Sequence, residues 1–269
     1  RTLKLYGQEI NLLTSAIARM NMFMHGIEEF DIVRGNTLSN PGLLENDELK
    51  KFNVILANPP YSIKSWDRKA FESDPFGRNL WGTPPQGCAD YAFQQHIQKS
   101  LDLENGRSIS LWPHGILFRD AETDMRRKMI EEDQVECVIG LGPNLFYNSP
   151  MEACLLITKT NKEKNKQGKV LIINAVKEVR QDKNIAYLES NHIERIYKAY
   201  SAYKDEEGFC KIVSIDDVLA HNASLNMALY VSNVDSSQEK ISLNEALENW
   251  TESSEKLANS MNQLFKELG

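Results

Sequence analysis

Two patterns of apolar residues divide the chain. From residue 3 to about residue 230, short runs rich in Val, Ile and Leu alternate with segments whose apolar residues recur at helical spacing. The C-terminal segment reads instead as one charged helix with an apolar stripe. We therefore expect an α/β domain over residues 1–234 and a separate helix over residues 238–269.

The apolar runs of the first region have the composition of strands. Several are nearly continuous in Val, Ile and Leu, as in strands buried on both faces of a parallel sheet. Repeated strand–helix–strand order implies right-handed crossovers and a doubly wound sheet, in which ligands bind at the carboxyl ends of the strands. We expect strands at 4–8, 31–34, 52–57, 107–112, 135–141, 153–158 and 170–174, and helices at 11–25, 90–103 and 122–132, with Asp90 as an N-cap.

The C-terminal helix carries a heptad seam. Its members follow alternating steps of four and three residues, with one polar interruption, which is typical of a coiled coil. The helix could fold back on its own domain, but the length of the seam favours contact with a partner. The seam comprises Leu243, Leu247, Trp250, Ser254, Leu257, Met261, Leu264 and Leu268.

Charge and composition limit the functions open to the chain. With 31 basic and 38 acidic residues the net charge is −7. This sign does not favour binding of nucleic acid by neutralisation of its phosphates alone, so a partner or a local basic patch must supply those contacts. The lysine-rich stretch 159–169 predicts a solvated hairpin or loop. No apolar run approaches the roughly 20 residues that span a bilayer and the first residues carry no signal-peptide pattern, so we expect a cytoplasmic protein without a membrane partner.

The four cysteines lie far apart, without the spacing of metal ligands. We expect buried free thiols, and neither a metal site nor a disulfide framework.

The most informative stretch is Asn58-Pro59-Pro60-Tyr61, which follows an apolar strand directly. The two prolines lack backbone donors, so the turn is rich in acceptors. The Asn58 side-chain carbonyl and the Pro59 main-chain carbonyl could each accept one N–H of an exocyclic amine and direct its lone pair at an electrophile. Tyr61 could stack on the base. The alternative is a simple strand-terminating turn.

This stretch resembles the (Asp/Asn/Ser)-Pro-Pro-(Tyr/Phe/Trp) motif of amino-methyltransferases that use S-adenosylmethionine. The chain is more closely similar to the modification subunits of type I restriction-modification systems, which are N6-adenine DNA methyltransferases. The resemblance is carried by residues 6–11, 18–22, 25–26, 58–61, 89–93, 113–119, 140–141 and 143–147.

The resemblance implies a Rossmann-like methyltransferase sheet that transfers the methyl group of S-adenosylmethionine to N6 of adenine in DNA. A specificity subunit would choose the target, and a restriction subunit and a second modification subunit would complete the assembly. An RNA or protein-glutamine methyltransferase, and a methyltransferase-like assembly scaffold, remain open alternatives. Label in RNA or protein but not DNA would favour the first, and partner binding without any methylation the second.

The resemblance also implies roles for individual residues. Glu9, at the end of a strand, would accept hydrogen bonds from the cofactor ribose, and Ile10 would pack on its adenine ring. Asn36 and Thr37 would border the adenine edge.

Two further positions are aromatic. The resemblance suggests that Phe146 or Tyr147 contacts the target base, although core packing explains these residues equally well. His114 reads as a loop histidine that makes a satisfied hydrogen bond rather than as a base.

One part of the family pattern is missing. The family's first strand and glycine-rich cofactor loop have no counterpart, and Gly140-Leu141-Gly142-Pro143 cannot replace them, since it has a proline where helix N–H groups should point and lacks a third glycine. We expect an N-terminally truncated catalytic domain with exposed apolar sheet edges, poor cofactor affinity and no activity by itself.

Overall fold

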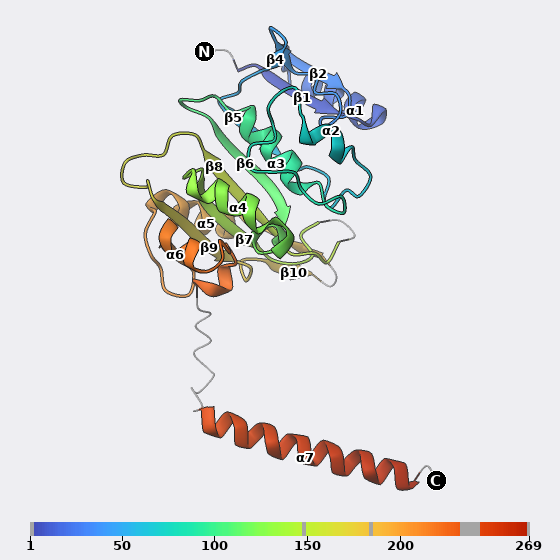
Figure 1. The fold of residues 1–269 in the computed structure, drawn as a ribbon, viewed down its shortest axis with the longest axis vertical. Helices are drawn as coiled ribbons and strands as arrows, with labels where there is room; N and C mark the ends of the chain where they lie inside the picture. Colours follow the sequence, from blue (N-terminus) through green and yellow to red (C-terminus); the bar gives the residue numbers. More distant parts are fainter. Residues whose placement is uncertain (1–2, 147–148, 183–184, 232–242, 268–269) are drawn as a thin grey trace. The chain divides into compact units, whose positions relative to one another are not determined.

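The computed structural model describes residues 3–146, 149–182, 185–231 and 243–267. The chain divides at residue 232 into a large unit, shown in blue to orange in Figure 1, and a small unit that contains the C-terminal helix. Each unit is described by itself.

A six-stranded sheet with the order β12-β9-β7-β8-β6-β5 forms the centre of the large unit. β5 and β6 are parallel, as are β7 and β9, whereas β8 runs antiparallel to both β6 and β7, and β12 antiparallel to β9. The sheet is therefore mixed, which corrects the expectation of a parallel doubly wound sheet. The strands are β5 (Val54–Ala57), β6 (Arg107–Pro113), β7 (Val135–Leu141), β8 (Ala153–Lys159), β9 (Lys169–Ala175) and β12 (Cys210–Ser214).

The connection between β7 and β8 explains the reversal. The described residues of segment 142–152 contain no helix, so the chain re-enters the sheet at the end where β7 leaves it. A parallel return needs a longer crossover, usually a helix.

The central strands β7, β8 and β9 are buried on both faces of this sheet, which accounts for their unbroken apolar runs. Val138 and Ile172 face one apolar cluster, which α3 (Asp90–Lys99), α4 (Thr123–Glu131) and α6 (Ile215–Ala220) complete. Ile139 and Ile173 face the opposite cluster, to which α5 (Ser190–Ala202) contributes Ala199. The result is the layered α/β arrangement of Figure 1.

Residues 5–34 form a βαβ motif within the large unit, with a two-stranded sheet of its own. β1 (Leu5–Glu9) and β2 (Phe30–Arg34) pair in parallel on either side of α1 (Leu12–Met24), whose N-cap Asn11 accepts hydrogen bonds from Leu13 N and Thr14 N. The predicted strands and helix are confirmed here. The apolar stripe of α1 is nevertheless exposed rather than packed: Leu13 is 70%, Ile17 52%, Met20 63% and Met24 76% accessible.

Several shorter elements complete the large unit. They are β3 (Leu44–Glu45), β4 (Glu48–Leu49), α2 (Arg68–Glu72), η1 (His114–Leu117), η2 (Asp120–Glu122), β10 (Arg180–Asp182), β11 (Ile185–Tyr187) and η3 (Met227–Leu229).

The lysine-rich segment 159–169 forms a largely exposed loop, as one of the two expected forms, and not a hairpin. It crosses from β8 to β9, which are separated in the sheet by β7. Lys162 is buried and lies 2.5 Å from Asp133, and Lys166 lies 2.9 Å from the buried Glu136. Two lysines therefore bind carboxylates that flank the start of β7, so charge compensation fixes this crossover.

The small unit contains one long helix, α7 (Leu243–Glu267). Four apolar seam residues are exposed: Leu247, Trp250, Leu257 and Met261. Leu268, the last seam position, lies outside the described residues. Among the helices of the described residues, none is both long and apolar enough to cross a membrane.

Candidate active site

The Asn-Pro-Pro-Tyr segment lies directly after β5, at its carboxyl end, as expected from the sequence. Asn58 is exposed, whereas Tyr61 is half-buried, with its ring centroid 6.5 Å from that of Trp112. The Tyr61 hydroxyl donates a 2.7 Å hydrogen bond to Asn58 Oδ1. The segment thus brings its amide and its aromatic side chain together.

This hydrogen bond fixes the orientation of the Asn58 amide. Burial, with further repulsion from Cys154 and Asp90, raises the pKa of Tyr61 to about 12, so the phenol stays protonated as a donor near neutral pH. A carbonyl oxygen has two lone pairs, and Tyr61 uses one of them. The other remains an acceptor at the exposed end of β5.

The buried carboxylate of Asp90 binds the residue that directly follows this segment. Asp90, at the start of α3, accepts a 2.6 Å hydrogen bond from the backbone N–H of Ser62, a non-glycine residue with a φ of 51°. Its other oxygen lies 2.5 Å from Arg119, which also donates at 2.9 Å to the buried Glu122. Asp90 is therefore not the N-cap that the sequence suggested: Ala89 occupies that position, and the Asp90 side chain instead binds Ser62, directly after the Asn58–Tyr61 segment.

The same cluster includes a cysteine. Ligand atoms of Cys88, Asp90 and Glu122 lie within 4.8 Å of one another, a grouping that the cysteine spacing did not predict. Burial raises the pKa of the Cys88 thiol to about 12, and Arg119 already places a positive charge against both carboxylates. These groups therefore form a buried, ion-paired cluster that holds the segment after β5 in place.

The residues expected at the cofactor come together at the ends of β1 and β2. Gly35 N donates a 3.1 Å hydrogen bond to Glu9 O, which joins the two strand ends. Glu9 Oε1 accepts from Asn11 N at 2.7 Å, and the neighbouring Ile10 is 59% exposed. Asn36 Oδ1 accepts from the backbone N–H groups of the next turn, which points its amide oxygen inward.

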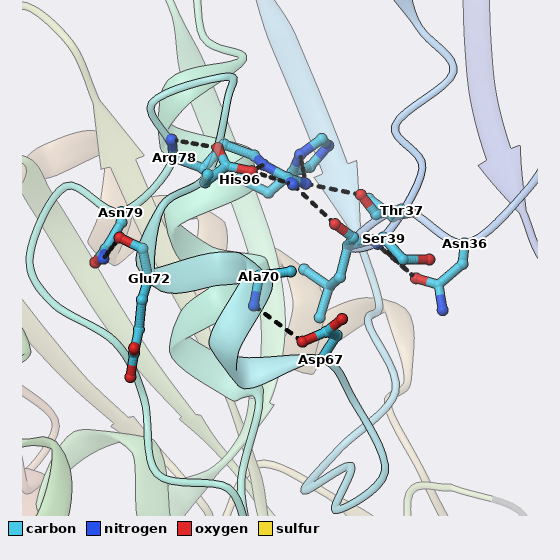
Figure 2. A network of polar contacts seen from close by, with 11 residues as sticks. Asn36, Thr37, Ser39, Asp67, Ala70, Glu72, Arg78, Asn79 and His96 are labelled. Atoms are coloured by element: carbon cyan, nitrogen blue, oxygen red, sulfur yellow. Dashed lines mark hydrogen bonds and ion pairs between the residues drawn. The ribbon is translucent and has the colours of Figure 1, made fainter.

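The turn that contains Asn36 and Thr37 is bound to a polar network (Figure 2). The buried Arg78 donates to Thr37 O and Leu38 O, each at 2.8 Å, and lies 2.5 Å from the buried carboxylate of Asp74. His96 of α3 lies beside it, with Nδ1 3.4 Å from Arg78 Nη1. Nothing in the sequence pattern indicates these contacts, because they join residues far apart in the chain.

His96 predicts a pH dependence of stability. Burial and the neighbouring Arg78 lower the pKa of His96 from 6.5 to about 3, so the folded state keeps the imidazole neutral while the unfolded chain takes up a proton below pH 6.5. Stability from this group is therefore present above pH 6.5 and falls as the pH drops towards 3, by at most about 1.4 kcal/mol per pH unit. In urea titrations from pH 7.5 to 4.5, His96→Gln should flatten this slope relative to the matched variant of the exposed His25, His25→Gln. Equal slopes for the two variants would contradict this assignment.

The remaining expectations from the sequence concern two aromatic residues, one histidine and the four cysteines. Phe146 is half-buried and bridges Ser149, and Tyr147 lies outside the described residues. His114 makes the expected hydrogen bond but begins the short helix η1 rather than lying in a loop: its Nε2 lies 2.7 Å from Ala153 O and its Nδ1 3.2 Å from Glu152. The four cysteines are buried free thiols, also as expected.

The Gly140–Pro143 stretch has a packing role. A Cβ at Gly140, within β7, would overlap the side chain of Met227, and one at Gly142 would overlap the carbonyl oxygen of Val176. Close packing therefore explains both glycines.

The residues predicted to bind a cofactor and those predicted to be catalytic form two separate clusters. Among the described residues, no hydrogen bond or ion pair joins Glu9 or Asn36 directly to the Asn58–Tyr61 segment. Both clusters are instead linked to α3, through His96 and Asp90 respectively.

The mixed sheet and the acceptor-rich loop at the end of β5 define an α/β protein of the methyltransferase type. Residues 1–239 match the N-6 DNA methylase family, and the chain belongs to that family. It is 32% identical over 256 residues to the type I restriction enzyme MjaVIII methylase subunit of Methanocaldococcus jannaschii, covering 91% of this chain and 44% of that protein. To the HindI methylase subunit of Haemophilus influenzae it is 28% identical, covering 92% and 56%.

A solved structure extends the likeness to three dimensions. The type I restriction-modification methyltransferase subunit from Streptococcus thermophilus superposes with a TM-score of 0.79 at 32% identity, covering 86% of this chain and 49% of that one. The chain thus spans about half the length of the proteins that it resembles.

Proposed function

We propose that this chain is the catalytic part of a type I modification subunit that transfers the methyl group of S-adenosylmethionine to N6 of adenine in DNA. The observation that carries the proposal is the Asn58–Tyr61 loop, whose oriented amide oxygen lies at the carboxyl end of β5. Membership of the N-6 DNA methylase family and the names of the similar methylase subunits support it.

In the proposed mechanism the loop positions the amine of an extruded adenine. The free lone pair of Asn58 Oδ1 and the main-chain carbonyl of Pro59 each accept one N–H, which turns the nitrogen lone pair out of conjugation. Tyr61 contacts the face of the base. S-adenosylmethionine, when bound, would supply the electrophilic methyl group from its sulfonium, and the broken carbon–sulfur bond would leave the neutral thioether S-adenosylhomocysteine. The amine then loses one proton to water, so no strong base is required.

The groups at the ends of β1 and β2 fit such a cofactor. Glu9 is an acceptor oriented by Asn11 N, as a pair of ribose hydroxyls requires. The exposed Ile10 offers an apolar surface for an adenine ring. We assign Asn36 and Thr37 to the adenine edge, and Phe146 and Tyr147 to the target base.

We also propose that a further strand with a glycine-rich loop pairs with β5 and β1. β5 is the outermost strand of its sheet, with Val54 61% and Leu56 74% exposed. Apolar edges of this kind normally pair or are covered. Without that strand we expect weak cofactor binding and no methyl transfer.

We further propose that residues 1–234 act as the catalytic domain and residues 238–269 as the subunit contact. The exposed seam of α7 supports docking on a helix of a specificity subunit, which would supply the DNA grip that a net charge of −7 does not. A restriction subunit and a second modification subunit would join the same complex.

The seam predicts a specific loss of binding. Leu257→Glu should weaken association with the specificity subunit by about 10- to 100-fold, because it places a charge at the centre of an apolar contact. Asn259→Glu, on the opposite face of α7, is the matched control and should bind normally. Affinities measured by surface plasmon resonance test this, and equal affinities would exclude the seam as the contact.

Labelling distinguishes the substrate classes. The complete gene product and its specificity subunit would be incubated with methyl-labelled S-adenosylmethionine and, in parallel, unmethylated DNA, RNA or protein. We expect label in DNA. Label confined to RNA or protein would support a different amino-methyltransferase, and no label from a cofactor-binding complex would support a scaffold.

A further inference from the structure

Arg78 connects two parts of the large unit that lie far apart in the sequence. We propose that Arg78 is a positioning residue that fixes the 36–38 turn for cofactor binding. The inference rests on the proposed cofactor site and adds to it a residue that does not itself touch the cofactor. In Figure 2 the Arg78 guanidinium lies between its own segment and the turn that contains Asn36 and Thr37.

The orientation of Arg78 is set by its own segment. Asp74 Oδ1 accepts from Nε at 3.0 Å and from Nη2 at 2.5 Å, and Asp74 Oδ2 accepts from the Arg78 backbone N–H at 2.8 Å. The guanidinium also lies 5.7 Å from the Phe71 ring and 5.5 Å from the Phe76 ring. A fork bound to a carboxylate and packed against aromatic rings is a rigid donor.

The remaining N–H groups of this fork bind the turn after β2. Nη1 donates to Thr37 O and Nη2 to Leu38 O, each at 2.8 Å. Other hydrogen bonds within the turn are local, from Leu38 N and Ser39 N to the Asn36 side chain. Among the described residues, the hydrogen bonds that tie segment 36–39 to the region beyond β5 are therefore those from Arg78.

The Arg78 contact and the contact beside the catalytic loop both involve the helix α3. Arg78 lies against His96 near the end of α3, and Asp90 at the start of α3 accepts from Ser62 N beside the catalytic loop. The two loops are thus positioned by opposite ends of one helix. Loss of the Arg78 contacts should therefore free the 36–38 turn and weaken cofactor binding, while Asp90 continues to hold Ser62 beside the catalytic loop.

Substitution of Arg78 should weaken cofactor binding much more than it slows methyl transfer. With the complete gene product and its specificity subunit, we expect Arg78→Met to raise the Kd and KM for S-adenosylmethionine by about 10- to 100-fold, with a much smaller change in kcat at saturating cofactor. Arg78→Lys keeps the charge beside Asp74 but not the fork, so it should recover folding more fully than cofactor affinity.

Arg126 provides the matched control. It is also a buried arginine that donates to main-chain carbonyls, those of Ala223 at 2.7 Å and Arg119 at 3.1 Å. Arg126→Met should lower the Tm as Arg78→Met does. At temperatures below the unfolding of both variants, it should leave the KM for the cofactor unchanged. Calorimetric titration with S-adenosylmethionine gives the Kd values.

The possible outcomes separate the two claims. A wild-type complex that binds no S-adenosylmethionine would overturn the proposed function and this inference together. A wild-type complex that binds it, with Arg78→Met or the milder Arg78→Lys retaining wild-type affinity, would overturn the positioning role alone.

Discussion

Asn58→Ala should lower the rate of DNA methylation by at least about 10²- to 10³-fold while leaving S-adenosylmethionine affinity and Tm unchanged. The expected loss is that of a preorganised group which interacts with the reacting atoms. The fold should tolerate the change, since Asn58 is exposed and its hydrogen bond is made to Tyr61 of the same loop. Single-turnover methylation with labelled cofactor measures the rate, and calorimetry the affinity.

Tyr61→Phe is the informative companion to this variant. It keeps the ring that would stack on the base and removes the hydroxyl that donates to Asn58 Oδ1. We expect a smaller reduction in rate than for Asn58→Ala, because the amide remains but loses its fixed orientation. A wild-type rate for Asn58→Ala would exclude the acceptor role of the loop.

Asp90→Asn should lower the free energy of unfolding by about 3 kcal/mol, the lower end of the range for a broken buried ion pair. The side chain is fully buried and accepts from both Ser62 N and Arg119, and a neutral amide cannot serve both donors equally. Arg119 is 30% exposed and keeps its contact with Glu122, which limits the loss. Urea denaturation at pH 7.5 measures it.

The control for this prediction is the nearby exposed residue Asp120. Asp120→Asn removes the same charge from a solvent-facing side chain and should change stability by less than about 0.5 kcal/mol. Equal effects for the two variants would show that net charge, rather than the support of the loop, controls stability. We also expect Asp90→Asn to reduce the methylation rate, since Ser62 lies next to Tyr61.

Local sequence signals predicted most of the regular structure. β7 is buried along its whole length, so its residues are almost uninterruptedly apolar, and its bounds at 135–141 were predicted correctly. The helix predicted at 11–25 from its apolar spacing is α1, and the structure shows that the Asn11 side chain caps its N-terminus. The position of the Asn58–Tyr61 loop was predicted correctly because the loop is one contiguous segment at a strand end.

Long-range pairing was not predictable in the same way. The reversal of β8 depends on the path of the preceding connection, and its apolar run is compatible with either direction. Arg78 binds carbonyl groups 40 and 41 positions earlier in the sequence, and backbone acceptors carry no residue-specific signal. Asp90 was taken for a helix cap because aspartate favours that position, whereas a buried arginine partner and the Ser62 N–H determine its role.

The measurement that most directly tests the central claim is mass spectrometry of nucleosides from unmethylated DNA after incubation with S-adenosylmethionine and the complete gene product bound to its specificity subunit. The account predicts N6-methyladenine from the wild-type complex and none above background from a folded, cofactor-binding Asn58→Ala complex. Absence of N6-methyladenine from a wild-type complex that binds the cofactor, or its formation by both complexes, would contradict it.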